Sequence, residues 1–355
     1  MSFLRNIIYD PMKFIKFSLL LLFLLGFCFV WLLFGSATSF SEKNKYVTVQ
    51  ESPSIEGSNL SRLNDASFVK YPILLDLVTS LTGGWKTLKA GKYEVKKGQS
   101  IWSIARQLKN GRLAEMKLVI NRIRIKEDLA KLISKNFAPD SVSVMNYLQS
   151  NDSLAKWHVD SSTVFTMIIP DTYNFYWNVS IDKIFQKLSD ANKNFWSKND
   201  RESKLTASKL SKEEVYILAS IVDEETNYDS DKYKIASFYI NRLHKEMPLQ
   251  ACPTIKYAMK DFTLTRIYEK YLSNPSLYNT YRHKGLPPGP ICTPSPKTID
   301  IVLNAPKTDF LFFVAKSDFS GYHHFSSNFA EHNSFAKEYQ KALDKYMAEK
   351  QAEKN

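Results

Sequence analysis

Cysteine is scarce in this sequence: three stand among 355 residues, and none belongs to a zinc-finger spacing. Also missing are the HExxH helix of metalloproteases, the glycine-rich P-loop and the GxSxG elbow of serine hydrolases. His323, His324 and His332 stand close together, but no carboxylate or cysteine completes an established set of metal ligands around them. These absences argue against metal catalysis, and the sequence predicts neither a metal site nor a cofactor.

Acidic residues are outnumbered, with 36 Asp and Glu against 48 Lys and Arg. The resulting net charge of +12 favours anionic partners such as nucleic acid, anionic lipid or an acidic polymer, without choosing among them. No recognition helix rich in basic side chains is present, so nucleic acid is not expected as a partner. A hydrophobic content of 44% allows well-packed cores, and fixed-period repeats are missing.

Charge is absent from residues 17–35, which spell FSLLLLFLLGFCFVWLLFG. A helical run of this length matches the thickness of a membrane, and it exceeds the apolar core of an ordinary signal peptide. Three basic residues precede the run, whereas none follows until Lys43. The positive-inside rule therefore places residues 1–16 in the cytoplasm. We expect a single-pass protein of the cell inner membrane with a periplasmic C-terminal domain; cleavage after Ala37 is the alternative.

Export would place the two cysteines beyond the apolar run, Cys252 and Cys292, in an oxidising compartment. Cys28 lies inside the run and is expected to be an ordinary small apolar residue. The remaining pair therefore suggests one disulfide, and two buried free thiols are the alternative.

A polar tether over 36–45 leads to the stretch GKYEVKKGQSIWSIARQLKNGR, which predicts a strand, a glycine turn and an amphipathic helix. Ser100 is the expected N-cap of this helix, and Gly111 is expected to end it. The buried stripe is expected at Ile101, Ile104, Ala105 and Leu108. This unit resembles half of a LysM module, a small fold that binds the glycan of peptidoglycan. A generic strand–helix unit without a ligand is the alternative.

Further along, the sequence predicts a strand over 117–125 followed by a helix over 126–137, and a longer helix from 181 to about 199. The lysine-rich stretch 201–212 is predicted to be a surface linker that opens a second domain. The stretch NYDSDKY at 227–233 is predicted to be a polar loop.

The apolar run YILASIVDEETNY contains three consecutive acids at residues 223–225. A capping-box pattern at 211–214 predicts that a helix begins there. On that helix Glu225 shares a face with Leu218 and Ile221, so it is the acid expected to face apolar neighbours. A carboxyl group held against apolar side chains has a raised pKa and can donate a proton near neutrality. Alternatively, all three acids lie on the solvent side of the helix end.

Ordered motifs follow from this point: ILASIVDEET, KIASFYINRL, LQACPTIKYAM, YNTY, GLPPGPICTP, and HHF with EHN. With the earlier LKAGKYEV and IPDTYNF, they make the chain resemble the YceG-like family of endolytic murein transglycosylases over most of its length after the apolar run. The resemblance implies cleavage of peptidoglycan strands between N-acetylmuramic acid and N-acetylglucosamine. It also implies a product with a 1,6-anhydro muramyl end, so that nascent strands are trimmed or terminated.

The resemblance assigns roles to individual residues. It places the catalytic acid at Glu225, the last acid of IVDEET, and makes Glu224 a surface residue. In lytic cleavage the C6 hydroxyl of the muramyl sugar is the nucleophile, so one carboxyl group can act first as acid and then as base. The implied substrate-positioning residues are Asn241, Gln250, Thr254, Tyr257, Tyr278, Asn279, Thr280, Tyr281, His323, His332 and Asn333.

Both exported cysteines stand where the family commonly has other residues: Cys252 replaces the Asp of a QTDPT motif, and Cys292 lies in ICTPS. The two motifs border the implied cleft. A disulfide between them would close a loop of about forty residues, and loop entropy alone gives roughly 4 kcal/mol for that size.

Together these expectations describe an α+β fold with an N-terminal transmembrane helix, a LysM-like subdomain and a C-terminal transglycosylase domain. The expected partners are peptidoglycan glycan strands and the inner membrane, with peptidoglycan synthases as a further possibility. Two rival functions stay open: a non-catalytic peptidoglycan-binding scaffold, and a hydrolytic muramidase with Asp223, Asp229 or Asp231 as its second carboxylate. The expected segments are the cytoplasmic N-terminus (1–16), the transmembrane helix (17–35), the tether (36–45), the LysM-like region (46–200), the catalytic domain (201–345) and a polar tail (346–355).

Overall fold

The computed structural model describes residues 11–49, 59–264 and 266–352, which fall into two compact units. The first unit comprises the chain up to residue 116 together with residues 174–179, and the second comprises residues 117–173 and everything from residue 180 onward. Most of the predicted cytoplasmic segment, residues 1–10, and the last three residues of the predicted tail lie outside the described residues.

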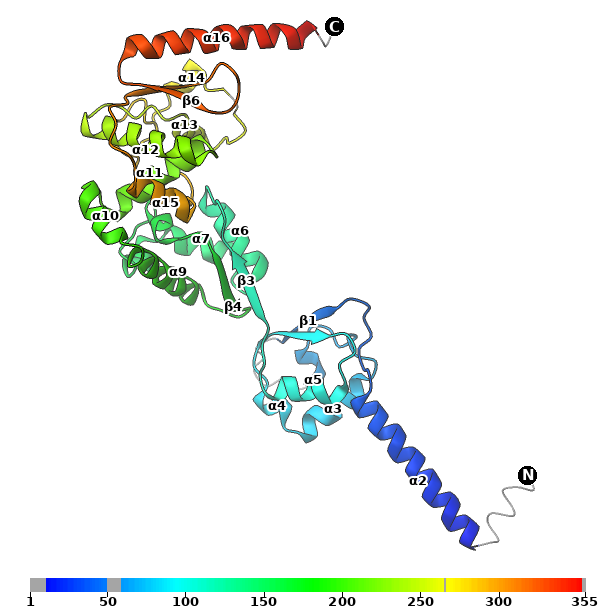
Figure 1. The fold of residues 1–355 in the computed structure, drawn as a ribbon. Coiled ribbons are helices and arrows are strands. Elements are labelled where there is room, and N and C mark those ends of the chain that lie inside the picture. Colours follow the sequence, from blue (N-terminus) through cyan, green and yellow to red (C-terminus); the bar gives the residue numbers. More distant parts are fainter. Residues whose placement is uncertain (1–10, 50–58, 265, 353–355) are drawn as a thin grey trace. The chain divides into compact units, whose positions relative to one another are not determined.

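The first unit begins with helix α2 (Pro11–Phe34), drawn in blue in Figure 1. Residues 12–34 of this helix are long and apolar enough to cross a membrane, and none of their most apolar window is buried. An apolar helix of this length with exposed side chains is expected to enter a lipid phase. By length and composition, α2 therefore matches the predicted transmembrane helix.

The rest of the first unit packs helices onto a two-stranded antiparallel sheet in which Val47 lies opposite Tyr93. Ser100 caps the helix after the sheet, since its hydroxyl accepts a hydrogen bond from the N–H of Ser103 at 3.2 Å. The predicted apolar stripe of that helix is buried, and Gly111 has a φ of +58° just beyond it. The predicted strand, the Ser100 N-cap, the buried apolar stripe and the end of the helix before Gly111 are confirmed. The elements are β1 (Asn44–Val49), η1 (Asn59–Arg62), α3 (Pro72–Leu81), α4 (Gly84–Thr87), β2 (Gly91–Lys96) and α5 (Ile101–Lys109).

The remaining elements include two further two-stranded sheets, formed by β3 with β4 and by β5 with β6. The elements are β3 (Glu115–Val119), α6 (Lys126–Asn136), α7 (Ser141–Gln149), α8 (Asn151–Ala155), η2 (Val164–Met167), β4 (Thr172–Tyr176), α9 (Ile181–Trp196), α10 (Arg201–Ser208), α11 (Lys212–Glu225), α12 (Asp229–His244), α13 (Cys252–Met259), α14 (Glu269–Leu272), α15 (Pro296–Leu303), β5 (Phe312–Ala315), β6 (His323–Ser326) and α16 (Phe329–Ala352). Mixed helices and short strands agree with the expected α+β class.

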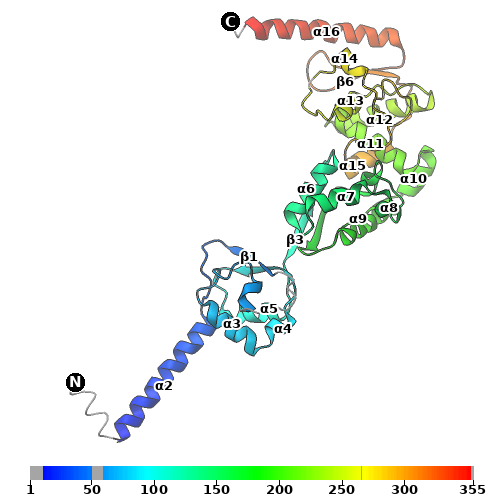
Figure 2. The ribbon, with the colours of Figure 1, turned by 180° about the vertical axis from the view of Figure 1, so that it is seen from behind.

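The core of the second unit is built around α11, which lies beside α15 in both views of the molecule (Figures 1 and 2). The predicted capping box is present: the N–H of Glu214 donates to Ser211 Oγ, and the carboxylate of Glu214 accepts from the N–H of Ser211. Every residue from 215 to 223 is buried. A helix that is buried on all sides needs a continuous apolar run, which explains why the sequence shows no polar face here.

Three of the predicted segments differ in the structure. The strand predicted over 117–125 ends at Val119, because Ile123 instead exchanges two hydrogen bonds with Thr293: its N–H donates to Oγ1 at 2.9 Å and its carbonyl accepts at 2.8 Å. The linker predicted over 201–212 is wrong, since helix α10 begins there. The buried guanidinium of Arg201 anchors α10 through two hydrogen bonds to Asp300, at 2.6 and 2.8 Å.

The polar loop predicted at NYDSDKY is also wrong, because α12 begins at Asp229 within it. Asp231 and Lys232 are buried on this helix. The carboxylate of Asp231 contacts His323, and the ammonium group of Lys232 pairs with Asp223. Local polarity suggested a solvated loop, but the pairing of Lys232 with Asp223 on α11, and the hydrogen bond that Asp231 accepts from the N–H of His323, allow both side chains to lie inside.

Candidate functional site

A cavity of about 360 Å³ lies at the C-terminal end of α11. Its walls come from α11, α12, α13, β5, α16 and the loops around residues 250 and 281, and most of them are apolar or aromatic. The lining residues are Glu225, Phe238, Arg242, Leu249, Gln250, Cys252, Tyr281, Phe312, Phe313, Phe329 and His332. Glu225 is the sole carboxylate among them.

Glu225 is the last residue of α11, and it projects into this apolar cavity as its helix face predicted. Burial raises the pKa of Glu225 to about 7, although a hydrogen bond from Tyr239 and the charge of Lys256 act in the opposite direction. The negative end of a helix dipole also disfavours a carboxylate at this position. Glu225 is therefore poised to hold and release a proton near neutral pH.

Tyr239 positions the carboxyl group of Glu225. It is fully buried on α12, and its hydroxyl donates to Glu225 Oε1 at 2.5 Å. The sequence analysis assigned no role to Tyr239. With Oε1 held by the tyrosine, Oε2 is the oxygen left to face a ligand.

Arg242 is a second cavity residue that the sequence analysis missed, although it follows Asn241 directly in the motif KIASFYINRL. Its buried guanidinium donates to the carbonyls of Leu311 and Pro248 and, at 2.9 Å, to the side-chain oxygen of Gln250. Burial lowers the pKa of Arg242. Because Arg242 engages the oxygen of Gln250, the amide NH₂ of Gln250 is the group that can donate into the cavity.

His332 also lines the cavity, and its ring stacks on Phe312 with 5.3 Å between the centroids. Burial and the nearby charge of Arg242 lower the pKa of His332, so its imidazole is neutral at neutral pH. Within the described chain, the Nδ1 atom of His332 is buried without a hydrogen-bond partner. A buried polar atom of this kind needs an explanation, and a ligand that donates or accepts a hydrogen bond would supply one.

Several predicted substrate residues instead hold the loops around the cavity. The amide of Asn241 donates to the carbonyls of Thr308 and Phe310. The hydroxyls of Thr254 and Thr280 are buried and lie 2.9 Å apart. These side chains use their polar groups on the protein itself, so they shape the site without lining it.

Asn279, His323 and Asn333 are three more predicted residues outside the cavity lining. The amide of Asn279 donates to the carbonyls of Leu272 and Asn274. His323 contacts Asp231 through its backbone N–H and through Nδ1, which lies 3.0 Å from the carboxylate. Asn333 follows the cavity residue His332, but it is not part of the lining itself.

Tyr257 and Tyr278 lie together in a different cavity, also of about 360 Å³, near α6, α7 and the end of α13. Their ring centroids are 4.6 Å apart. The motifs YNTY and LQACPTIKYAM therefore each contribute to both cavities, because Tyr281 and Cys252 face Glu225 whereas Tyr278 and Tyr257 face the second cavity.

The predicted disulfide is not formed: Cys28, Cys252 and Cys292 are all free. The thiol of Cys252 lies 3.2 Å from the hydroxyl of Tyr281 in the Glu225 cavity. The thiol of Cys292 is buried and directed at the carbonyl of Ser220 at 3.4 Å. Both thiols are free, as in the alternative, but only Cys292 is buried as that alternative expected, whereas Cys252 is exposed.

The other two acids of the triplet at 223–225 are bound by cations from other segments. Asp223 is only 2% exposed, and it accepts hydrogen bonds from Lys232 and Thr298 at 2.5 Å and from Arg122 at 3.0 Å. Burial opposes ionisation of Asp223, but these hydrogen bonds and the neighbouring charges together hold its pKa below the usual value.

The prediction that Glu224 is an exposed surface residue is wrong. Both of its oxygens accept from Arg124 at 2.9 Å, and its side chain is only 13% exposed. A bidentate pair of this kind fixes the end of α11 beside the segment that follows β3.

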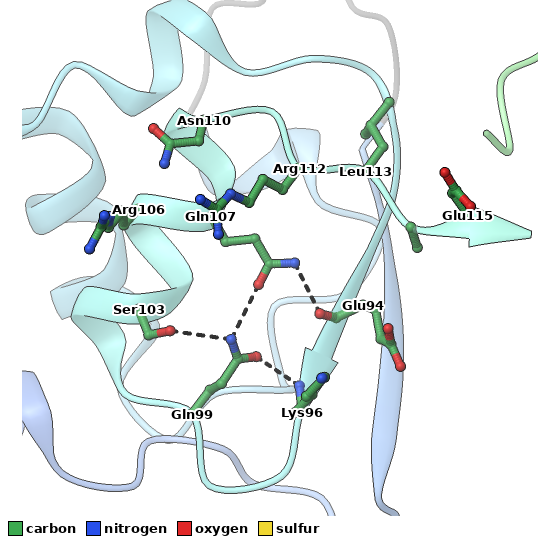
Figure 3. A pocket seen from close by; sticks show the side chains of 11 residues that line it. Glu94, Lys96, Gln99, Ser103, Arg106, Gln107, Asn110, Arg112, Leu113 and Glu115 are labelled. Atoms are coloured by element: carbon green, nitrogen blue, oxygen red, sulfur yellow. Dashed lines mark hydrogen bonds between the residues drawn. The ribbon is translucent and has the colours of Figure 1, made fainter.

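The first unit has a polar cavity of about 440 Å³ along β2 and α5 (Figure 3). The side-chain amide of Gln99 lies at its centre, donating towards Ser103 and Gln107, while Gln107 in turn donates to the carbonyl of Glu94. Arg106 and Arg112 add positive charge, and no aromatic side chain is among the residues that line it. This cavity can donate and accept many hydrogen bonds, but it offers no ring on which a sugar could stack.

Comparisons with known proteins support the resemblance. A sequence model of the YceG-like family matches residues 47–338. An endolytic murein transglycosylase of Bacillus subtilis (strain 168) is 39% identical over 152 residues, which cover 42% of this chain and 39% of that protein. An endolytic murein transglycosylase of Streptococcus pneumoniae serotype 2 is 26% identical over 315 residues, covering 78% of this chain and 55% of that protein. The chain thus spans about half or less of the length of these relatives.

A solved structure is also similar to this chain. The crystal structure of a YceG-like protein from Listeria monocytogenes aligns with a TM-score of 0.54 and 26% sequence identity. The alignment covers 83% of this chain and 99% of the crystallised chain.

Proposed function

The chain belongs to the YceG-like family, and we propose that it is an endolytic murein transglycosylase, a lyase that cuts peptidoglycan strands between N-acetylmuramic acid and N-acetylglucosamine. The observation that carries the proposal is Glu225, a carboxyl group in an apolar cavity with a pKa near 7. Two similar proteins that bear this activity in their names add support.

In the proposed reaction Glu225 acts twice. First, Oε2 donates its proton to the glycosidic oxygen, the bond from the muramyl C1 to that oxygen breaks, and the N-acetylglucosamine leaves with the proton. The carboxylate of Glu225 then takes the proton of the C6 hydroxyl as O6 bonds to C1. Glu225 regains its proton, no water is consumed, and the product carries a 1,6-anhydro end.

The other lining residues would hold the sugar during these steps. The NH₂ of Gln250 and the hydroxyl of Tyr281 are polar groups available for sugar hydroxyl and acetamido groups, and the ring of His332 lines the same cavity. Phe312 and Phe313 provide apolar surface for the ring and exclude water. Asn241, Thr254, Asn279, Thr280 and His323 are proposed to maintain the loops that position these groups.

The rival functions have less support. A hydrolytic muramidase needs a second carboxylate close to the first. Asp223 is bound by Lys232, Asp231 by His323 and Asp229 by Lys297, and none of the three lines the Glu225 cavity. A non-catalytic scaffold would not need a carboxyl group with a raised pKa in an apolar cavity.

Two finer proposals concern the rest of the chain. The LysM-like strand–helix unit and its polar cavity would bind peptidoglycan. Of the predicted region over 46–200, residues 117–173 and 180–200 belong to the same compact unit as the predicted catalytic domain over 201–345. α2 would anchor the protein in the inner membrane, with the catalytic domain in the periplasm according to the positive-inside rule. Peptidoglycan synthases that extend nascent strands are the protein partners that such an anchor would bring within reach.

The proposal is tested by incubating the full-length protein in detergent with purified sacculi and analysing the released muropeptides by mass spectrometry. We expect fragments that end in 1,6-anhydro-N-acetylmuramic acid. Absence of released fragments would favour the scaffold, and fragments with only hydrated ends would favour the muramidase.

Activity should depend on pH through Glu225. The first step needs the protonated carboxyl group, so kcat/KM should fall about tenfold per pH unit above the pKa of about 7. In Tyr239→Phe the hydrogen bond that lowers this pKa is lost, and the alkaline limb should move to higher pH. Rates between pH 5 and 9 measure both. A limb near pH 4.5, or an unmoved limb in Tyr239→Phe, would contradict the assignment.

A further inference from the structure

The cavity that contains Tyr257 and Tyr278 has the features of a built binding site. Both tyrosines are half-buried, and their rings are tilted by 41° with their centroids 4.6 Å apart, so they present a continuous aromatic wall. Ligand sites typically combine such apolar walls with a few fixed polar groups. A pyranose ring, with one apolar face and hydroxyls at its edge, fits a wall made of tyrosines.

The charged residues that line this cavity are Lys126, Glu127 and Lys260, and the last two pair with each other at 3.4 Å. Lys126 is half-buried at the start of α6, and its ammonium group donates to the hydroxyl of Ser161. In the described part of the chain Lys126 forms no ion pair. The nearest carboxylates are engaged elsewhere, since Asp160 accepts hydrogen bonds from the N–H groups of Ser162 and Thr163, and Glu127 pairs with Lys260.

Burial lowers the pKa of Lys126, which reflects the cost of holding a cation here without a direct counter-charge. An anionic group on a ligand would relieve that cost. The cavity thus combines a surface for a sugar ring with a half-buried cation whose direct hydrogen-bond partner is the hydroxyl of Ser161 and not a carboxylate.

One wall of the cavity is held by a close contact between two segments. Residues 285–290 approach the segment around Ser162 so closely that a Cβ on Gly289 would lie 2.1 Å from the carbonyl oxygen of Ser162. Only glycine permits this contact. Pro290 follows directly and lines the cavity, so its shape does not depend on a ligand to form it.

The position of the cavity relates it to Glu225. α13 begins at Cys252, which lines the Glu225 cavity, and Tyr257 lies five residues later on the same helix. Five residues of α-helix rise about 7.5 Å. The loop that carries Tyr278 and Tyr281 spans the same two cavities. The two cavities therefore share α13 and the loop over 278–281 as walls.

We propose that this cavity is a subsite for a muramyl residue that bears its stem peptide, with the sugar ring against Tyr257 and Tyr278 and a peptide carboxylate at Lys126. Stem peptides supply the carboxylates of peptidoglycan, so the subsite would make the enzyme prefer strands that retain peptides over strands from which peptides have been removed. The inference rests on the proposed function, because it takes the occupant of the neighbouring cavity to be a glycan strand.

The test measures binding in the full-length Glu225→Gln protein, in which turnover is blocked. Two probes are compared: a peptidoglycan tetrasaccharide with stem peptides whose carboxylates are free, and the same tetrasaccharide without peptides. Lys126→Met should weaken binding of the peptide-bearing probe about tenfold, as expected for loss of one hydrogen bond between charged groups. Binding of the peptide-free probe should not change, and Lys126→Arg should restore most of the loss.

Lys131→Met is the matched control, because Lys131 lies on the exposed side of the same helix. Equal affinity of the Lys126→Met and Lys131→Met proteins for the peptide-bearing probe would overturn the inference. So would an equal loss for both probes, which would indicate a general structural effect. Cleavage of sacculi by the wild-type protein is assayed separately: anhydro products alongside unchanged binding in Lys126→Met reject only the subsite, whereas absence of products rejects the proposed function.

Discussion

Glu225→Gln should abolish glycan cleavage, with kcat reduced by at least about 100-fold, the lower range for loss of a general acid. The amide has the same size as the carboxyl group and can still accept the hydrogen bond of Tyr239, so the fold should remain intact. What it cannot do is release a proton to the glycosidic oxygen and later take one from the C6 hydroxyl. Release of soluble muropeptides from sacculi measures the loss, and thermal unfolding checks the fold.

Glu224→Gln is the matched control for this experiment, because it makes the same change one residue earlier on α11. Glu224 pairs with Arg124 and does not line the cavity, so this protein should retain most of its activity. An active Glu225→Gln protein together with an inactive Glu224→Gln or Asp223→Asn protein would move the catalytic acid and refute the assignment.

Asp223→Asn should strongly destabilise the second unit. The substitution leaves Lys232, whose side chain is 7% exposed, without its anionic partner at 2.5 Å, and it weakens the contact with Arg122. Removing one member of a buried ion pair costs about 3–5 kcal/mol. For a unit of this size, a cost in that range corresponds to a fall in melting temperature on the order of 10 °C. Calorimetry or circular dichroism measures the change.

The double variant Asp223→Asn/Lys232→Met separates the ion pair from other effects of the substitution. Because it removes the unpaired buried cation, it should melt at a higher temperature than Asp223→Asn alone. A single variant as stable as the wild type would show that Asp223 is not the counter-charge that keeps Lys232 buried.

Local features of the fold could be predicted from the sequence because they depend on residues a few positions apart. The Ser100 cap, the stripe of α5 and the capping box at Ser211 and Glu214 are of this kind, and all are present. The surroundings of the three acids were not predictable in the same way. Arg122 is 101 residues from Asp223 in sequence, and Thr298 is 75 residues from it.

Glu225 illustrates both the success and the limit of the sequence argument. Its helix face and the family motif agreed on the acid that lies in the cavity, but α11 is buried on all sides, and Asp223 is also inside. The sequence motifs also could not distinguish residues that line the cavity from residues whose side chains hold the surrounding loops. Gln250 and Asn241 stand in neighbouring motifs, yet one lines the cavity and the other bonds to Thr308 and Phe310. That difference depends on the three-dimensional path of β5 and its preceding loop.

The most direct test of the central claim, lytic cleavage by a single carboxyl group, is digestion of peptidoglycan in water enriched in heavy oxygen. If O6 of the muramyl sugar attacks C1 with Glu225 as acid and then base, no label should enter the new muramyl end, which should have the mass of the 1,6-anhydro form. A labelled, reducing muramyl end would show that water is the nucleophile, and it would contradict a mechanism in which Glu225 acts without a second carboxylate.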